Sequence, residues 1–171
     1  EGYGLSETSP VVTFNQQWFG RKPGSVGRPV WGVEVEITQP DLEGELAFMG
    51  AGEVGEIAIR GHNVFTGYLN RPEATDAVMV DGWFRSGDLG YKDADGFVFI
   101  VDRKKDLIIR GGLNVYPREV EEVLARHPAV SQVAVVALPD DTYGAEICAV
   151  VVTGADQEVT ESALIPRSQG H

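Results

Sequence analysis

Apolar and polar residues follow one another along this chain in short stretches that predict a protein rich in strands. Residues 33–37 alternate apolar and acidic side chains, which is the pattern of a half-buried strand. Residues 55–61 form a second predicted strand bounded by glycines. Residues 97–101 are more apolar, which predicts a strand buried on both faces, and residues 106–110 predict another. The N-terminal part is therefore expected to be mainly β, with one short helix at 72–78.

The pattern changes after residue 102. Residues 117–127 predict the best helix in the chain, because they begin with proline, carry acids in the first turns and end with basic residues. Four of its side chains share one helical face, namely Val120, Val123, Leu124 and His127. Two β-branched stretches, 130–138 and 147–152, predict strands. Together these elements indicate a small α+β unit.

Composition narrows the classes of function. The 171 residues carry 14 Lys and Arg against 26 Asp and Glu, so the net charge of −12 disfavours binding to nucleic acid or to an anionic membrane surface. The one cysteine, Cys148, stands in an apolar stretch and is expected in the core. It excludes an internal disulfide and suits a reducing, cytoplasmic setting. We expect no membrane span, since no apolar stretch approaches the ~20 residues that one needs.

The N-terminal residues 2–10 hold the first candidate for chemistry. Glycines flank Tyr3, which would allow backbone and ring to approach a ligand closely. Glu7 stands between the hydroxyls of Ser6 and Thr8, a set that suits a hard cation and phosphate oxygens, as in a magnesium nucleotide. A simple turn is the alternative interpretation.

Three further segments each allow a chemical and a purely structural interpretation. Asp88 follows an aromatic pair and a glycine, so its carboxylate could accept two hydrogen bonds from a ribose diol or simply form a turn. The charge run 102–106 is either a solvated linker or a hinge between domains. Gly111 and Gly112 follow a strand, as in a hairpin turn or a place where a slender ligand passes the backbone.

Five ordered motifs resemble those of the adenylate-forming enzymes. They are Tyr3-Gly4-Leu5-Ser6-Glu7-Thr8, the Gly-Glu-Ile and Gly-Tyr segment within 55–75, and the segments 81–90, 101–106 and 111–119. The resemblance runs from residue 2 to about residue 152. The Asp-Arg-Lys-Lys-Asp and Asn-Val-Tyr-Pro forms are most similar to fatty-acyl and aryl-CoA ligases.

The resemblance implies a role for each matching residue. Tyr3 would stack on adenine, and Ser6, with Thr8 as a weaker candidate, would contact phosphate. Glu7 would hold Mg²⁺ and serve catalysis. Five further positions concern the ribose, the hinge and the coenzyme: Asp88 and Arg103 at the ribose hydroxyls, Lys105 as the catalytic hinge, and Gly111 with Gly112 along the pantetheine tunnel. Tyr143 would stack on the adenine of coenzyme A.

The resemblance also implies a β-rich α+β fold. Residues 1–102 would be the end of the large domain, a distorted β-barrel subdomain, and 103–106 the hinge. Residues 107–158 would form most of a small C-terminal α+β lid. Residues 159–171 do not resemble the family and are interpreted as a tail of the kind that a vector supplies.

The implied activity is an AMP-forming ligase that uses ATP, a carboxylic acid, expected to be a fatty acid, and coenzyme A. The family's Gly-rich phosphate loop ending in Pro-Lys-Gly is absent here, and no lysine follows Lys105, so the chain by itself is expected to be inactive. One alternative is an adenylation domain that loads a carrier protein. Another is a non-catalytic module that forms a homodimer or swaps a domain, because strands without neighbours expose their edges.

Overall fold

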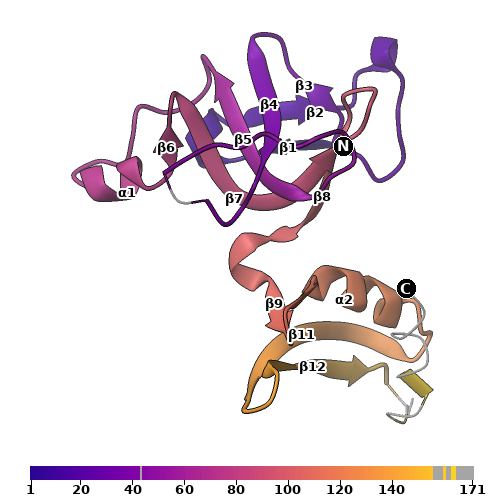
Figure 1. The fold of residues 1–171 in the computed structure, drawn as a ribbon. Coiled ribbons are helices and arrows are strands. Elements are labelled where there is room, and N and C mark those ends of the chain that lie inside the picture. Colours follow the sequence, from indigo (N-terminus) through magenta and orange to yellow (C-terminus); the bar gives the residue numbers. More distant parts are fainter. Residues whose placement is uncertain (43, 156–159, 161–162, 165–171) are drawn as a thin grey trace. The chain divides into compact units, whose positions relative to one another are not determined.

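The computed structural model describes residues 1–42, 44–155, 160 and 163–164, and these fall into two compact units. The first comprises Glu1–Lys104 and the second Lys105–His171, so the division lies within the segment 103–106. Strands dominate both units and helices are few, which confirms the β-rich α+β fold class (Figure 1). That residues 103–106 act as a hinge stays a prediction.

A small antiparallel sheet opens the first unit. Its order is β1 (Gly2–Gly4), β2 (Val11–Phe14) and β3 (Arg28–Pro29). The 3-10 turns η1 (Ser6–Thr8) and η2 (Gln17–Phe19) follow the first two strands. These strands are only two to four residues long, so they carry too few positions for an alternating pattern to be visible in the sequence.

A five-stranded antiparallel sheet forms the body of the first unit. Its strands are β4 (Val33–Thr38), β5 (Gly55–Gly61), β7 (Trp83–Lys92), β6 (Met79–Val80) and β8 (Val98–Arg103). The order is β4-β5-β7-β6, with β8 paired to the other half of β7. The long strand β7 bends along its length and so serves two neighbours on one side (Figure 1). The predicted strands at 33–37 and 55–61 are confirmed.

The core of the first unit lies on one face of this sheet. Its buried side chains come from five strands and include Val12, Val35, Ile37, Ile57, Ile59, Phe84 and Val98. The strand prediction at 97–101 is confirmed, but its burial on both faces is wrong. Phe97 and Val98 are buried, whereas Phe99 and the two residues after it are half-exposed. The buried Val98 also bridges Gly27, whereas Phe99 stacks on Tyr91 of β7, itself half-exposed, with ring centroids 4.7 Å apart.

A buried ion pair joins the neighbouring strands β5 and β7. Glu56 of β5 and Arg85 of β7 are each 5% exposed, and the Arg85 Nη2 lies 2.5 Å from Glu56 Oε2. The Arg85 Nε donates to the same oxygen at 3.1 Å. The guanidinium also donates to the carbonyls of Pro40, at 3.0 Å, and Leu42. Arg85 therefore joins two strands and the loop after β4 through hydrogen bonds that leave little of its charge unsatisfied.

Two hairpins and a helix form most of the described part of the second unit. Strands β9 (Ile108–Arg110) and β10 (Leu113–Val115) pair antiparallel, as do β11 (Val130–Asp140) and β12 (Gly144–Thr153). Helix α2 (Pro117–Ala125) packs on β11. Its Leu124 is buried, as is Val135 of β11. The Glu121 carboxylate accepts a hydrogen bond from the backbone N–H of Val135 at 2.8 Å.

Several smaller predictions can be compared with these elements. The short helix α1 (Pro72–Asp76) is confirmed, and so is the apolar face of α2 at Val120, Val123 and Leu124, but His127 lies beyond the end of the helix. Cys148 is half-exposed on β12, opposite Val136 of β11, so its expected core position is wrong; this face of the hairpin lies away from the buried Val135. Most of the predicted tail at 159–171 lies outside the described residues. Within the part of the chain that is described, no helix has the length and apolarity to cross a membrane.

The buried pair gives a first prediction. Replacing Glu56 by Ala strands the Arg85 guanidinium without its carboxylate, which we expect to lower the free energy of unfolding of the first unit by about 3–5 kcal/mol. Tryptophan fluorescence during urea unfolding measures this unit specifically, since Trp18, Trp31 and Trp83 all belong to it.

The matched control is Glu34→Ala. Glu34 pairs with Arg60 across the same sheet, but their side chains are 59% and 47% exposed, so only a small change is expected. Equal effects of the two substitutions would contradict the importance of the buried pair.

Candidate functional site

The N-terminal motif and the Gly-Tyr motif meet in the first unit. The 3-10 turn η1 presents Glu7, and its Oε1 accepts a hydrogen bond from the Tyr68 hydroxyl at 2.9 Å. The backbone N–H of Phe65 donates to the Glu7 carbonyl at 2.8 Å. The Phe65 ring contacts both Tyr68 and Phe84 edge-on, at 4.8 and 5.5 Å between centroids. Glu7 is therefore held from two sides, and Tyr68 is a partner that the sequence analysis did not single out.

The glycines beside Tyr3 have a structural reason. A methyl group at Gly4 would lie 1.8 Å from the Pro10 carbonyl oxygen, and one at Gly2 would lie 2.9 Å from the Phe14 ring. The close approach expected at these glycines is therefore made by β2 and the turn before it, and a ligand is not needed to explain them.

The two hydroxyl candidates beside Glu7 differ in their surroundings. Ser6 is exposed, whereas Thr8 is fully buried. The Thr8 hydroxyl lies 2.9 Å from the Leu5 carbonyl and 2.8 Å from the Pro10 carbonyl, and it accepts from the Leu5 N–H at 3.0 Å. Thr8 therefore stabilises the turn, and this geometry does not support the expectation that its hydroxyl contacts phosphate. Ser6 stays a candidate.

Tyr3 and Asp88, 85 residues apart, are joined directly. The Tyr3 hydroxyl donates to Asp88 Oδ2 at 2.7 Å. Burial raises the pKa of the Tyr3 hydroxyl well above its usual value, and the negative charge of Asp88 raises it further. Tyr3 is thus held as a neutral donor to the carboxylate. The residues predicted for adenine and for ribose consequently lie side by side.

Asp88 lies in a bulge of β7. Glu56 pairs with Leu89 and Ala58 pairs with Arg85. Three residues of β7, 86–88, therefore stand opposite a single residue of β5, Ile57. Gly87 adopts φ +75°, a conformation that favours glycine. On the opposite side Asp88 pairs in register with Arg103 of β8, whose Nε lies 3.8 Å from Asp88 Oδ1. The two predicted ribose residues are therefore adjacent.

Glu7 is the candidate ligand for a magnesium ion. Among the described residues, no group of three or more His, Cys, Asp and Glu could hold a metal by itself. A single carboxylate fits Mg²⁺ nevertheless, because this ion keeps several waters and is usually bound by one or two carboxylates together with substrate phosphates. Glu7 is half-buried and hydrogen-bonded by Tyr68, so its position is fixed.

The second unit brings together its own predicted residues. Gly111 and Gly112 are the two central residues of the β9–β10 hairpin, with φ of +57° and +83°, so the hairpin-turn interpretation is confirmed. The Gly111 N–H donates to the Tyr143 carbonyl at 2.9 Å. A methyl group at Gly111 would lie 3.3 Å from the Tyr143 ring. The turn and the predicted stacking residue are therefore adjacent, and both are exposed.

Two charged residues beside this turn were missed by the sequence analysis. The guanidinium of Arg110 lies 4.4 Å from the Tyr143 ring centroid, and it binds both oxygens of Glu146 at 2.9 and 2.8 Å. The hydrogen bond from Arg110 lowers the pKa of the Glu146 carboxyl. Arg110 therefore covers one face of the Tyr143 ring. The only signal in the sequence was a charged residue within an otherwise apolar strand, at the end of 107–110 and again between Ala145 and Ile147.

The predicted hinge residue Lys105 lies in the 3-10 turn η3 (Lys104–Asp106) and is exposed. Its neighbour Lys104 is the last residue of the first unit, and Lys104 Nζ lies 3.4 Å from Glu56 Oε2. The role of Lys105 in catalysis stays a prediction.

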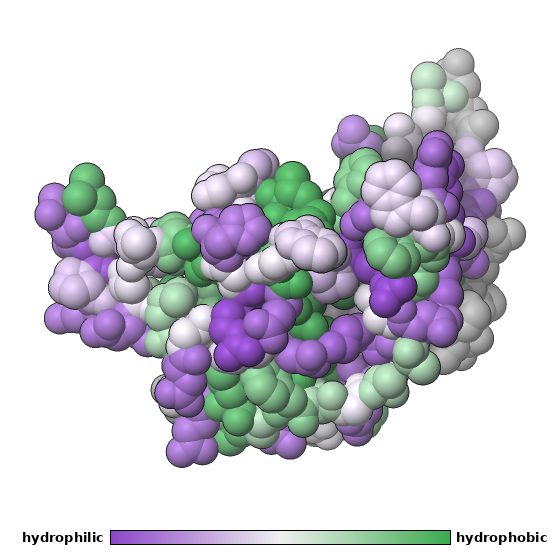
Figure 2. Space-filling view, turned by 90° about the horizontal axis from the view of Figure 1, so that it is seen from above, coloured by the Kyte–Doolittle hydropathy of each residue, from purple (hydrophilic) through white to green (hydrophobic). Residues whose placement is uncertain are grey.

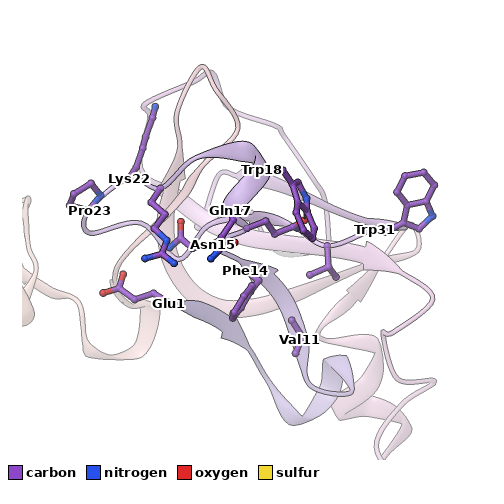
Figure 3. A pocket seen from close by; sticks show the side chains of 12 residues that line it. Glu1, Val11, Phe14, Asn15, Gln17, Trp18, Lys22, Pro23 and Trp31 are labelled. Carbon is purple, nitrogen blue, oxygen red and sulfur yellow. Dashed lines mark hydrogen bonds between the residues drawn. The ribbon is translucent and has the colours of Figure 1, made fainter.

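A pocket of the first unit lies elsewhere. It has a volume of about 1050 Å³ and is lined by Val11, Phe14 and Trp18 with several polar residues, and Figure 3 shows Trp31 at its far rim. Trp18 and Trp31 are 80% and 96% exposed, and hydrophobic side chains reach the surface in Figure 2 as well. Because Tyr3, Glu7 and Asp88 do not line it, this open pocket is separate from the candidate site.

Comparison with known families gives two matches along the chain. Residues 1–69 match the family described as AMP-binding enzyme, and residues 119–168 match the AMP-binding enzyme C-terminal domain. The second match extends into the segment 159–171 that the sequence analysis set apart.

Known relatives and solved structures agree with these matches. A long-chain-fatty-acid–CoA ligase of Bacillus subtilis is 47% identical over 99% of this chain, and a 2-succinylbenzoate–CoA ligase of Geobacillus is 41% identical over 99%. The chain spans 30% and 34% of their lengths. ATP-bound MatB from Rhodopseudomonas palustris superposes with a TM-score of 0.91 at 37% identity, covering 99% of this chain and 33% of that one. The Bacillus subtilis O-succinylbenzoate coenzyme A synthetase in complex with AMP gives 0.87 at 35% identity, covering 99% and 34%.

The Tyr3–Asp88 contact predicts a pH dependence. A raised pKa means that the folded state holds the Tyr3 proton more tightly than the unfolded state, in which a tyrosine has a pKa of about 10. This contribution to stability is complete below about pH 10 and is lost as the pH rises above it. We expect the free energy of unfolding of the first unit, measured in urea by tryptophan fluorescence, to fall less steeply above that pH in Tyr3→Phe than in the parent.

The control is Tyr143→Phe, which removes a hydroxyl from the second unit. It should leave the alkaline slope of the first unit as it is in the parent protein. Identical slopes for Tyr3→Phe and the parent would show that the Tyr3 hydroxyl does not titrate as inferred.

Proposed function

This chain belongs to the adenylate-forming family of AMP-binding enzymes, and from that premise we propose that the protein activates a carboxylic acid with ATP and transfers the acyl group to coenzyme A. In the first half-reaction a carboxylate oxygen attacks the α-phosphorus of ATP, and pyrophosphate leaves. In the second, the thiol sulfur of coenzyme A attacks the acyl carbon, and AMP leaves. The part of the protein in such chemistry is positioning and stabilisation of charge.

The observation that carries this proposal is the contact between Tyr3 and Asp88. Their hydrogen bond of 2.7 Å places an aromatic ring beside a carboxylate that Arg103 approaches from β8. A ring that stacks on adenine and a carboxylate that accepts from the 2′- and 3′-hydroxyls of ribose need this arrangement. Ser6 and Glu7 follow on η1, where they would meet the phosphates and Mg²⁺.

The second unit supplies the proposed coenzyme A contacts. The turn at Gly111 and Gly112 brings an exposed backbone close to Tyr143, so a thin chain such as pantetheine could pass beside it. Arg110 covers one face of the Tyr143 ring, which leaves the other for an adenine. Lys105 would be the residue about which this unit turns between the two half-reactions.

We propose a fatty acid as the acyl substrate. The support is the similarity to the long-chain-fatty-acid–CoA ligase of Bacillus subtilis. The similarity to a 2-succinylbenzoate–CoA ligase makes an aryl acid the competing substrate class. We also propose a cytoplasmic setting, in keeping with a lone free cysteine.

The activity of the full-length protein tests this function. With ATP, coenzyme A and palmitate it is expected to release AMP and form the thioester, as measured by chromatography, and succinylbenzoate should be a poorer substrate. Asp88→Ala should raise the KM for ATP by about tenfold or more, the equivalent of a charged hydrogen bond. Asp95→Ala, an exposed carboxylate of the same unit, is the control. Absence of any acid-dependent AMP release would overturn the proposal.

The 171-residue chain tested by itself should behave differently. We propose that it does not catalyse ATP–pyrophosphate exchange, since it holds neither a Gly-rich phosphate loop nor a lysine after Lys105. Exchange above the level of a blank would contradict this.

We further propose that the isolated chain self-associates through the exposed valines of β11 and β12. A strict monomer in sedimentation velocity at high concentration would count against that second part.

A further inference from the structure

The bulge that carries Asp88 has a buried support of its own. Residues 86–88 stand opposite one residue of β5, so the regular ladder between β5 and β7 is interrupted there. The Asp88 N–H donates to the Ser86 hydroxyl at 3.1 Å, a bond within the bulge. A bulge of this kind keeps one shape only if its backbone groups find partners outside the ladder.

Glu56 supplies that partner. Its Oε1 accepts a hydrogen bond from the Gly87 N–H at 3.1 Å, while its Oε2 binds the Arg85 guanidinium at 2.5 and 3.1 Å. The carboxylate therefore fixes both the last residue before the bulge and the middle of the bulge. Asp88 follows directly, so its position depends on that of Gly87.

Glu56 cannot act on a ligand directly, because its side chain is 5% exposed and both oxygens are engaged by protein groups. Lys104, whose own side chain is 39% exposed, adds a weaker contact at 3.4 Å. The effect of Glu56 on chemistry must therefore pass through the backbone of the bulge. In this respect it differs from Tyr3 and Arg103, which approach the Asp88 carboxylate itself.

We propose that Glu56 is a positioning residue for the nucleotide site: through the Gly87 N–H and Arg85 it sets the geometry with which Asp88 receives the ribose diol. The inference rests on the proposed function, in which Asp88 binds ribose. A buried ion pair can often be replaced by apolar residues at little cost in stability. A positioning role gives a specific reason for the charge of Glu56.

The informative substitution is Glu56→Gln. A carboxylate accepts on both oxygens, whereas an amide accepts on one side and donates from the other. The new amide at this position can therefore satisfy either Arg85 or the Gly87 N–H, and its NH₂ group then faces a donor. The matched control is Glu34→Gln, which makes the same chemical change in an exposed pair of the same sheet.

The first measurement needs no ligand. In an NMR spectrum of the full-length protein, the Gly87 amide should exchange with solvent at least about tenfold faster in Glu56→Gln than in the parent, because its acceptor is lost or weakened. Glu34→Gln should leave this rate unchanged. An unchanged Gly87 rate in Glu56→Gln would overturn the proposed hold on the bulge.

The second measurement compares dissociation constants for AMP and for 2′,3′-dideoxy-AMP, which lacks the diol. We expect the parent to prefer AMP by about tenfold or more, the value of a charged hydrogen bond. Glu56→Gln should lower this ratio by at least about threefold, and Glu34→Gln should keep it. A loss of stability alone would weaken both nucleotides equally and leave the ratio unchanged.

The outcomes separate the two levels of inference. If the parent does not distinguish AMP from the dideoxy compound, the proposed role of Asp88 fails, and the proposed function with it. If the parent distinguishes them and Glu56→Gln does so equally well, only the role of Glu56 is overturned. Should Glu56→Gln not fold, the double variant Glu56→Gln with Arg85→Gln removes the stranded charge, and the same ratio decides the question.

Discussion

The first unit depends on one buried electrostatic constraint, the pair of Glu56 and Arg85. Two charges removed from water are tolerated only when nearly all of their hydrogen-bonding groups are satisfied. Here that requirement joins β5, β7, the loop after β4 and the Gly87 N–H at one point. A sheet held in this way can contain a bulge without losing its register elsewhere, and the bulge is the feature that takes Asp88 out of the regular ladder with β5.

The candidate site is a consequence of that bulge and of a second, smaller sheet. Strand β1 brings Tyr3 to Asp88, and β8 brings Arg103 to the other side of the same carboxylate. The turn after β1 presents Glu7, which Tyr68 holds by its hydroxyl. Each of these side chains thus lies at a strand end or a strand irregularity, where backbone geometry fixes its position and where a ligand can still reach it.

The second unit uses turns in the same way. A two-residue glycine turn lies beside the turn that carries Tyr143, and Arg110, which is hydrogen-bonded to Glu146, lies over the Tyr143 ring. The turn is accessible because glycine has no side chain, and the ring is presented because a guanidinium supports one of its faces. The two units therefore differ in the groups they present: a carboxylate beside an aromatic ring in one, and an exposed backbone beside an aromatic ring in the other.

The sequence by itself determined the fold class, the longer strands, helix α2 and the identity of most candidate residues, because periodicity and turn residues are local properties and the motifs are contiguous. Only the tertiary structure decided what these residues contact. It showed that Thr8 and the glycines beside Tyr3 support the backbone, that residues 99–102 are half-exposed, and that Tyr3 contacts Asp88. It also revealed the role of Glu56, a charged residue within an apolar strand. That role depends on contacts with Arg85 and Gly87, about thirty residues later, and pairing between distant strands is not encoded in any local pattern.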